Sequence, residues 1–363
     1  MQVPENVKVL SLAEKTLIPS HRALLVARGA TEISNSPFLV YHPSALPLLG
    51  PSPSLTCVLD HPAHPFAHEA GVYLPATQSV IVTSNRLASP SGTPRIALSR
   101  LRKGAAGTWT WEELDTDVAM PNGGVNHPST GHVLLCAQGM HNSPGGLVLL
   151  DPSSNPPAST PLLTHYRGRA FNSPNDVVVH SDGSAWFTDP VYGWEQGFRP
   201  APQLPNQVYR FDPATGDVRV VADGFGRPNG ICFSPDERVV YVTDTEWVHG
   251  DGSVDDSRAS TIYAFDVQEH HGAPFLVNRR VFAMADTGIP DGIKCDCDGN
   301  VYSGCGDGLN VWSPAGSLLA KVLVAGGVSN FCFTEGGEVV LLNETKVWVL
   351  KLDSGVKGAL LGL

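Results

Sequence analysis

The 363-residue sequence has no run of about 18 consecutive apolar residues, the length that a membrane-spanning helix needs. Its N-terminus also lacks the continuous apolar region and the small-residue cleavage site of a secretory signal. Basic residues are outnumbered, 24 Lys and Arg against 35 Asp and Glu, which gives a net charge of −11. Nucleic acids and anionic membranes select basic surfaces, so we expect neither as a partner.

Cysteine is sparse and does not form a metal-binding pattern. There are seven cysteines, an odd number. Cys295 and Cys297 lie two residues apart on an expected strand, and we do not expect this spacing to make a zinc pair. We interpret the cysteines as reduced, buried thiols of an intracellular protein, and we expect a cytoplasmic location.

Turn-forming residues, by contrast, are abundant, with 37 Gly and 30 Pro. The segment Arg169 to Pro190 is the best example of how they are used. Its loop residues, Asn172 to Asn175, precede a β-branched strand, Val177 to Val179. A turn at Ser181 to Ser184 then leads into a second strand, Ala185 to Thr188.

This strand–turn–strand unit occurs six times in the sequence. The copies are 38 to 62 residues apart, and their leading residues are Glu69, Gly123, Asn175, Asn229, Asp291 and Ser329. A period near fifty, made of short strands without helical periodicity between them, is typical of a radial repeat. The sequence therefore predicts an all-β fold, a six-bladed β-propeller.

The two ends of the chain are expected to meet in the last blade. The sixth copy, Ser329 to Leu350, has room for only about three strands, so an N-terminal strand is needed to complete it. Candidate strands are Phe38 to Tyr41 and Ser54 to Leu59, and a short helix fits within Val7 to Val26. The expected division is an N-terminal extension with a closing strand (1–50), a propeller (51–352) and a loose C-terminal tail (353–363).

The leading residues of the repeats carry the predicted chemistry. Each opens the innermost strand of its blade, so all six should surround one end of the central channel. Four have oxygen-bearing side chains: Glu69, Asn175, Asn229 and Asp291. Two carboxylates and two amides, without histidine or cysteine, are ligands for a hard cation. We predict a Ca²⁺ site, although another divalent cation would also be accepted.

Three segments resemble a known family. They are NSPNDVVVHSDGSAWFTDP, RPNGICFSPDERVVYVTDT and PDGIKCDCDGNVYSG, and they are similar to signature segments of the SMP-30/gluconolactonase (regucalcin) family, with microbial or fungal lactonohydrolases among the expected relatives. The resemblance covers roughly residues 55–350. It implies a six-bladed lactonase acting on a small-molecule lactone, with Glu69 as the acidic ligand of the first blade.

The expected mechanism uses the cation as a Lewis acid on the lactone carbonyl and Asp291 as the base that activates water. Asp176 is a weaker candidate for the base, because alternation along the strand turns it away from Asn175. A histidine of the second blade, His141 or His127, remains an alternative base, as in paraoxonase-type propellers.

The predicted substrate-binding residues are Ser173, Asn175, His141, Tyr192, Trp194 and Trp247. Ser173 stands where sugar-lactone relatives can carry an arginine that touches substrate hydroxyls. Together with the three aromatic residues, this departure favours a less polar lactone. Two other functions stay open: another metal-dependent ester or phosphotriester hydrolase, and a Ca²⁺-binding propeller without catalysis.

Overall fold

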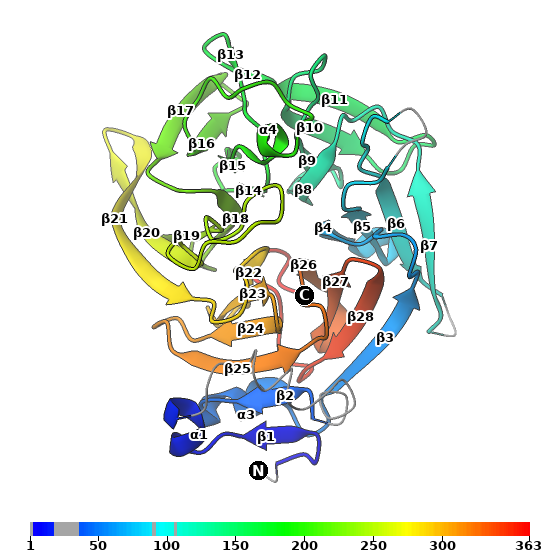
Figure 1. Cartoon of the computed structure of the whole chain (residues 1–363), viewed down its shortest axis with the longest axis vertical. Helices are drawn as coiled ribbons and strands as arrows, with labels where there is room; N and C mark the ends of the chain where they lie inside the picture. The colour runs from blue at the N-terminus through cyan, green and yellow to red at the C-terminus, as the bar shows by residue number, and fades with distance from the viewer. Residues whose placement is uncertain (1–2, 18–35, 89–91, 105–106) are drawn as a thin grey trace.

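Six four-stranded antiparallel units surround a central axis in the computed structural model of the chain, which describes residues 3–17, 36–88, 92–104 and 107–363 (Figure 1). Each blade runs outward from an inner strand at the axis, and consecutive strands within a blade pair as neighbours. The predicted all-β, six-bladed β-propeller is therefore confirmed.

From the axis outward, the first blade contains β4 (Glu69–Leu74), β5 (Ser79–Thr83), β6 (Leu98–Lys103) and β7 (Trp109–Leu114). The second contains β8 (Pro121–Asn126), β9 (Val133–Ala137), β10 (Gly146–Asp151) and β11 (Ala158–Leu163). The third contains β14 (Val177–Val179), β15 (Ala185–Asp189), β16 (Gln207–Asp212) and β17 (Asp217–Ala222).

The fourth blade contains β18 (Pro228–Phe233), β19 (Val239–Asp244), β20 (Thr261–His270) and β21 (Ala273–Met284). The fifth contains β22 (Ile293–Cys295), β23 (Val301–Cys305), β24 (Gly308–Trp312) and β25 (Leu318–Leu323). The sixth contains β26 (Asn330–Phe333), β27 (Glu338–Asn343), β28 (Lys346–Lys351) and β3 (Ser54–Asp60).

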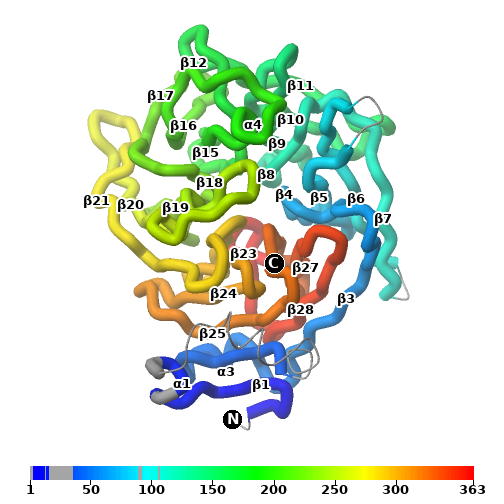
Figure 2. The backbone as a smooth tube through the Cα atoms, viewed as in Figure 1, coloured from blue at the N-terminus to red at the C-terminus, as the bar shows by residue number. Residues whose placement is uncertain are grey.

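The ring closes through β3, which pairs antiparallel with β28 and supplies the outer strand of the sixth blade (Figure 2). The other N-terminal strands go elsewhere. Strand β2 (Phe38–Val40) pairs with β25, and β1 (Val7–Val9) pairs with β2, so both extend the fifth blade. Helix α1 (Leu12–Leu17) lies within residues 7–26, where a short helix is expected, whereas Val7–Val9 of that range form β1; residues 18–26 lie outside the described residues.

Short elements fill the connections between strands. They are η1 (Pro43–Ala45), α3 (Leu46–Leu49), η2 (Pro75–Thr77), η3 (Glu335–Gly337), α4 (Tyr192–Glu195) and the small hairpin of β12 (His165–Tyr166) and β13 (Arg169–Ala170). Helix α4 connects β15 to β16 at the end of the propeller where the inner strands begin. None of the described helices is long and apolar enough to cross a membrane.

The hydrophobic core is divided among the contacts between neighbouring blades. For example, Val178 and Trp186 of the third blade pack with Ile231 and Val240 of the fourth. Similar clusters join the other pairs of neighbours, including the sixth blade with the first. Each blade is therefore stabilised mainly by the two beside it, as in other repeat folds.

The C-terminal segment is packed, which corrects the expectation of a loose tail. The Ala359 amide donates to the Cys295 carbonyl at 2.9 Å, and the Cys297 amide donates to the Lys357 carbonyl at 2.8 Å. Val356 is buried, and Leu361 and Leu363 pack against the core between the sixth and first blades. The tail lies across the channel, which Leu360, Leu361 and Leu363 line, and its C-terminus is marked in Figure 1.

All seven cysteines are free thiols, and five of them are buried. Cys295 is buried on β22, whereas Cys297 just beyond that strand is exposed. The two side chains differ in environment because β22 ends at Cys295; within a strand, residues two apart would face the same side. The prediction of buried thiols holds for five of the seven cysteines but is wrong for Cys57 and Cys297, which are exposed.

Candidate cation site

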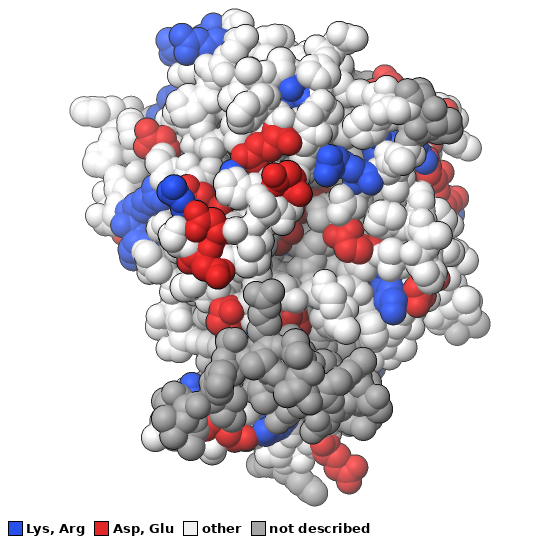
Figure 3. Space-filling view, in the orientation of Figure 1, with Lys and Arg blue, Asp and Glu red and all other residues white. Residues whose placement is uncertain are grey.

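The four predicted ligands lie at the end of the propeller where the inner strands begin. Glu69 is the first residue of β4 and Asn229 the second of β18, while Asn175 and Asp291 lie two residues before β14 and β22. Acidic side chains gather near the middle of the face shown in Figure 3. The repeats thus place these four side chains at equivalent ends of their inner strands.

The two carboxylates are held in surroundings that disfavour their negative charge. Burial, and after it the charge of Asp291, raises the pKa of Glu69 well above its ordinary value. Asp291 is half-buried, and burial raises its pKa to about 6. The charge of His68 and a hydrogen bond from Asn229 oppose that rise. Such a pair of acidic groups is suited to bind a cation, which would relieve the unfavourable charge.

His68 is already paired with another acid. Its Nδ1 lies 2.6 Å from Oε1 of Glu344, whose Oε2 accepts a hydrogen bond from the Asn85 amide at 3.1 Å. Burial disfavours the charged imidazole, but the charge of Glu344 and this hydrogen bond outweigh it and raise the pKa of His68 to about 10. His68 therefore carries a positive charge next to Glu69, with Glu344 as its counterion.

Two buried oxygens at the site have no hydrogen-bond partner among the described residues. They are Oδ1 of Asn175 and Oδ1 of Asp291. A buried acceptor without a partner costs roughly 1–3 kcal/mol, so both oxygens would be stabilised by a ligand that contacts them. Carboxylate and amide oxygens are what Ca²⁺ prefers. The residues present thus fit a hard divalent cation.

Threonine hydroxyls connect neighbouring blades at the level of the site. Thr83 Oγ1 donates to the Asn122 carbonyl at 3.1 Å, Thr188 Oγ1 to the Asn229 carbonyl at 2.6 Å, and Thr243 Oγ1 to the Asp291 carbonyl at 3.1 Å. All three threonines lie in the second strand of a blade and are fully buried. In these three blades, the threonine thereby fixes a backbone carbonyl near the start of the next blade's inner strand.

Two aspartates hold the loops that lead into the site. Asp189 at the end of β15 accepts hydrogen bonds from the amides of Asn172 and Ser173 at 2.9 and 2.8 Å. Asp244 at the end of β19 accepts them from Gly226 and Arg227 at 3.0 and 2.8 Å. A Thr-Asp pair recurs as Thr188-Asp189 and Thr243-Asp244. In each pair the aspartate holds the loop that leads to the asparagine of its own blade, and the threonine holds the backbone of the next blade.

Sequence reasoning missed two asparagines that contact the predicted ligands. The Asn122 amide donates to the Asn175 carbonyl at 3.1 Å, and the Asn330 amide donates to Oε2 of Glu69 at 2.7 Å. Both are buried. Each lies one position from the leading residue of its repeat, Gly123 or Ser329, so the repeat register alone does not select it.

The predicted substrate-binding residues fall into two groups. Tyr192 on α4 is half-buried, and its hydroxyl is hydrogen-bonded to Thr245 of the fourth blade. Ser173 is buried beneath α4, where its hydroxyl donates to the Pro190 carbonyl at 2.7 Å and accepts from the Gly193 amide at 2.9 Å. These two residues are built into the wall of the site, and their contact with substrate stays a prediction.

The other predicted contacts are closer to solvent. Trp194 is 49% exposed, and His141 is exposed with Nε2 at 3.2 Å from the Gly197 carbonyl. Trp247 is half-buried and donates its indole N–H to Asp256 at 2.8 Å. A role of Trp194, His141 and Trp247 in substrate binding stays a prediction.

The two weaker candidates for the base also have definite places. His127 directly follows β8 at the end opposite the site, and its Nδ1 lies 3.1 Å from Oγ1 of Thr130. Asp176 is buried, and its carboxylate accepts hydrogen bonds from the amides of Val177 and Ile231 at 2.9 and 3.3 Å. Neither arrangement favours proton transfer at the site.

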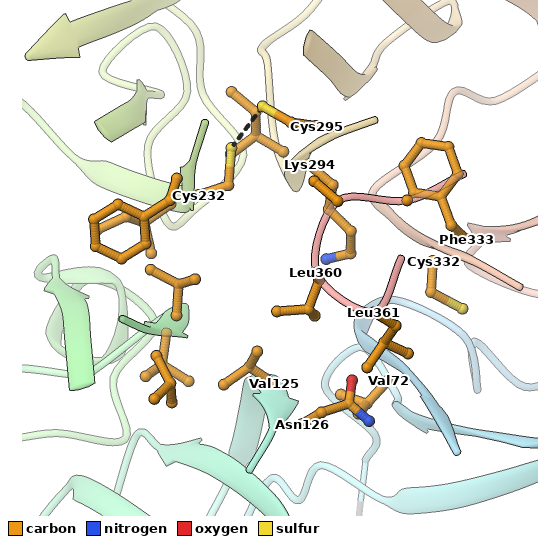
Figure 4. Close-up of a pocket in the computed structure, with 18 of the residues that line it drawn as sticks. Val72, Val125, Asn126, Cys232, Lys294, Cys295, Cys332, Phe333, Leu360 and Leu361 are labelled. Carbon is orange, nitrogen blue, oxygen red and sulfur yellow. Dashed lines mark hydrogen bonds between the residues drawn. The ribbon is translucent and has the colours of Figure 1, made fainter. Parts of the chain in front are cut away.

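The central channel continues beyond the site as a cavity of about 270 Å³ (Figure 4). Its walls include Val72 and Val125 of the inner strands, and the tail residues Leu360 and Leu361 lie across it. The thiols of Cys232 and Cys295 lie 3.8 Å apart in its wall. None of the four predicted ligands lines this cavity, so the cavity and the candidate cation site are separate features of the channel.

A six-bladed propeller with two carboxylates and two amides at one end of its inner strands is a scaffold suited to cation-assisted chemistry. The model of one family matches the chain over residues 97–341, more than half of its length. The chain belongs to the family described as SMP-30/Gluconolactonase/LRE-like region. The predicted family is therefore confirmed.

Named relatives agree with this assignment. The chain is 29% identical to "Lactonohydrolase oryL" of Aspergillus oryzae over 357 residues, which cover 91% of this chain and 77% of that protein. It is 30% identical to a "Gluconolactonase" of Zymomonas mobilis over 194 residues, 50% of this chain and 51% of that protein. A solved gluconolactonase of Xanthomonas campestris superposes with a TM-score of 0.69 at 26% identity, covering 86% of this chain and 93% of that one.

Proposed function

We propose that this chain is a metal-dependent lactonase that opens a cyclic ester with Ca²⁺ at the site of Glu69, Asn175, Asn229 and Asp291. The observation that carries the proposal is the pair of buried oxygens without partners, Asn175 Oδ1 and Asp291 Oδ1. The lactonohydrolase and gluconolactonase names of its relatives support the reaction. Another divalent cation would satisfy the same oxygens.

When bound, the cation supplies Lewis-acid chemistry, because it withdraws electrons from a carbonyl oxygen and lowers the pKa of nearby water. The carboxylate of Asp291 accepts a proton from the water that attacks the carbonyl carbon. The ring C–O bond then breaks, and the same carboxylate returns the proton to the departing alkoxide. The product is a hydroxy acid, and the carboxylate of Asp291 is restored.

The pKa of Asp291 suits this role. Burial raises it to about 6, close to the neutral range in which a general base is most effective. Glu69 is less suited to be the base, because its Oε2 already accepts a hydrogen bond from Asn330 at 2.7 Å. We therefore assign Glu69 to cation binding alone.

We infer a less polar lactone as the substrate. Ser173 offers no long cationic side chain, and its hydroxyl is engaged by Pro190 and Gly193. Tyr192 and the exposed Trp194 provide apolar surface on α4 beside the site. Such a wall favours an alkyl substituent over a ring rich in hydroxyls.

The test is a panel of lactones followed by pH-stat titration, with and without chelator. We expect acid release from alkyl-substituted lactones that stops on chelation and returns with Ca²⁺. Turnover that persists in chelator would show that the reaction does not need a cation, which contradicts the proposal. Calcium binding without turnover on any lactone, ester or phosphotriester indicates a propeller without catalysis, and turnover of phosphotriesters alone indicates the alternative hydrolase.

A further inference from the structure

Helix α4 (Tyr192–Glu195) is anchored to the fourth blade at both of its ends: Glu195 pairs with the Arg227 side chain, and Tyr192 reaches the Arg227 backbone through Thr245. Arg227 is buried and lies two positions before Asn229. Residues 192–195 belong to the connection between β15 and β16 of the third blade. The anchoring therefore joins two blades that each contribute an asparagine to the candidate cation site.

The first anchor is a bidentate ion pair between Arg227 and Glu195. Arg227 Nε lies 3.0 Å from Oε2 of Glu195, and Arg227 Nη2 lies 2.5 Å from Oε1. The Gly250 amide also donates to Oε2 of Glu195 at 2.8 Å. Forked guanidinium–carboxylate pairs fix orientation as well as distance, and a lysine cannot reproduce them.

The second anchor runs through Tyr192 and the backbone of Arg227. The Tyr192 hydroxyl is hydrogen-bonded to Thr245 Oγ1, and Thr245 donates to the Arg227 carbonyl from N at 3.0 Å and from Oγ1 at 3.1 Å. Burial raises the pKa of Tyr192; the hydrogen bond with Thr245 opposes this rise, and the charge of Asp291 adds to it. This second anchor therefore holds Tyr192 against the backbone of the fourth blade.

The remaining donors of Arg227 are engaged by the protein as well. Nη1 donates to the Glu246 carbonyl at 3.1 Å, and Nη2 lies 2.7 Å from Nδ1 of His249. Arg199, the next arginine along from α4, donates to the carbonyls of Phe171 and Asn172, among others. Both guanidinium groups therefore hold the wall together, and their hydrogen bonds are made within the protein.

The packing around the helix leaves no space for a Cβ at two glycines. A Cβ at Gly193 would lie 2.4 Å from Cγ of Arg199, and one at Gly250 would lie 2.6 Å from Cβ of Glu195. Contacts this short do not occur in folded proteins, so glycine is required at both positions. The helix is seated tightly against both blades.

We propose that Arg227 and Glu195 form a clamp, the Glu195–Arg227 clamp, that fixes α4 beside the candidate cation site and thereby selects neutral lactones with an apolar substituent. Arg227 is a positioning residue in this account, because it acts through Tyr192 and Trp194. The selectivity rests on the proposed lactonase function, whereas the clamp itself does not.

The experiment compares Arg227→Met, Arg227→Lys and Glu195→Gln with a matched control, Arg210→Met. Arg210 is also buried and makes an ion pair with Asp182 at 2.9 Å, but Asp182 lies in the turn between β14 and β15, away from the site. Glu195→Gln keeps the other partners of Arg227, so it tests the clamp if Arg227→Met does not fold.

The first readout is hydrogen exchange of the peptide spanning residues 190–199, which requires no activity. The amides of Glu195 and Gln196 donate to the carbonyls of Val191 and Tyr192, so they report on α4 directly. We expect exchange at least about tenfold faster in Arg227→Met, an intermediate rate in Arg227→Lys, and no change in Arg210→Met. Unchanged exchange in both Arg227→Met and Glu195→Gln overturns the clamp.

The second readout is the ratio of kcat/KM for an alkyl-substituted δ-lactone to that for unsubstituted δ-valerolactone. We expect this ratio to fall about tenfold in Arg227→Met, with kcat on δ-valerolactone within about twofold of the unaltered chain. An equal rise in KM for both lactones without faster exchange means that Arg227 binds substrate directly, which overturns its positioning role. If the unaltered chain hydrolyses no lactone, the proposed function fails while hydrogen exchange still decides on the clamp.

Discussion

Asp291 and Glu69 are the two carboxylates of the candidate cation site, and their surroundings differ. Asp291 is half-buried and has an oxygen without a partner among the described residues, whereas Glu69 is buried and accepts a hydrogen bond from Asn330 at 2.7 Å. The hydrogen bond from the Asn330 amide favours the ionised form of Glu69 and so weakens this carboxylate as a proton acceptor, while leaving it able to bind a cation. Neutralising Asp291 is thus expected to remove the proton acceptor, whereas neutralising Glu69 is expected to weaken cation binding.

Asp291→Asn is expected to abolish turnover, because it keeps an oxygen for the cation but removes the proton acceptor. The loss of kcat should be on the order of 10²–10⁴-fold, and saturating Ca²⁺ should not restore it. Glu69→Gln should act through weaker cation binding, so excess Ca²⁺ should restore part of its activity. The measurement is kcat for both variants across a calcium titration, with circular dichroism to confirm the fold.

A return of Asp291→Asn to near-normal kcat at saturating Ca²⁺ would show that the base lies elsewhere. His141→Ala and His127→Ala are then the variants to compare, since a histidine base would make one of them the severe change. The exposed position of His141 and the place of His127 at the far end of β8 predict only small effects.

Single residues show where sequence reasoning stops. Asn175 and Asp291 could be selected because each leads a repeat with a recognisable turn. Asn122 and Asn330 could not, because their hydrogen bonds to Asn175 and Glu69 connect neighbouring blades. Partners in different blades are far apart in the chain, and no local pattern records which side chains meet.

At the scale of elements, the repeat period predicts the six blades, and the short last copy predicts a closing strand from the N-terminus. The destination of each N-terminal strand depends on packing: β3 closes the sixth blade, while β2 adds to the fifth. The same holds for α4, since a short polar and aromatic loop gives no sign that Glu195 will meet Arg227. The packed tail was missed because its few apolar residues show no periodicity.

The pairing of β3 with β28 can be tested by a disulfide. Thr56 and Val349 are directly opposite in the register, so Thr56→Cys with Val349→Cys is expected to cross-link on oxidation. A bond between residues so far apart in the chain typically stabilises by about 2–4 kcal/mol, which should raise the melting temperature until a reductant is added. Thr56→Cys alone is the control, and failure of the double variant to cross-link would contradict the register.

At the scale of the whole molecule, the ring places acidic groups from separate blades at one end of the channel. Burial raises the pKa of Asp291 from 3.8 to about 6 and that of Glu69 well above its ordinary value. Without a cation, Asp291 binds more protons in the folded state than in the unfolded state between pH 4 and 6. Its contribution to stability therefore falls as pH rises through that window.

Calcium is expected to reverse this dependence, because it binds the ionised carboxylates and competes with protons. At a fixed Ca²⁺ concentration, the gain in melting temperature should be larger at pH 7.5 than at pH 5. Differential scanning calorimetry of the unaltered chain and of Asp291→Asn measures the effect, which should be weaker in the variant. An equal gain at both pH values would show that calcium stabilises the protein away from these carboxylates.

The central claim is that one cation is held by oxygens from four blades, and an anomalous difference map from crystals soaked in Ca²⁺ tests it most directly. The account predicts one peak on the axis, about 2.3–2.6 Å from oxygens of Glu69, Asn175, Asn229 and Asp291. A map without density there, with the four side chains pointing away from one another, would contradict the account.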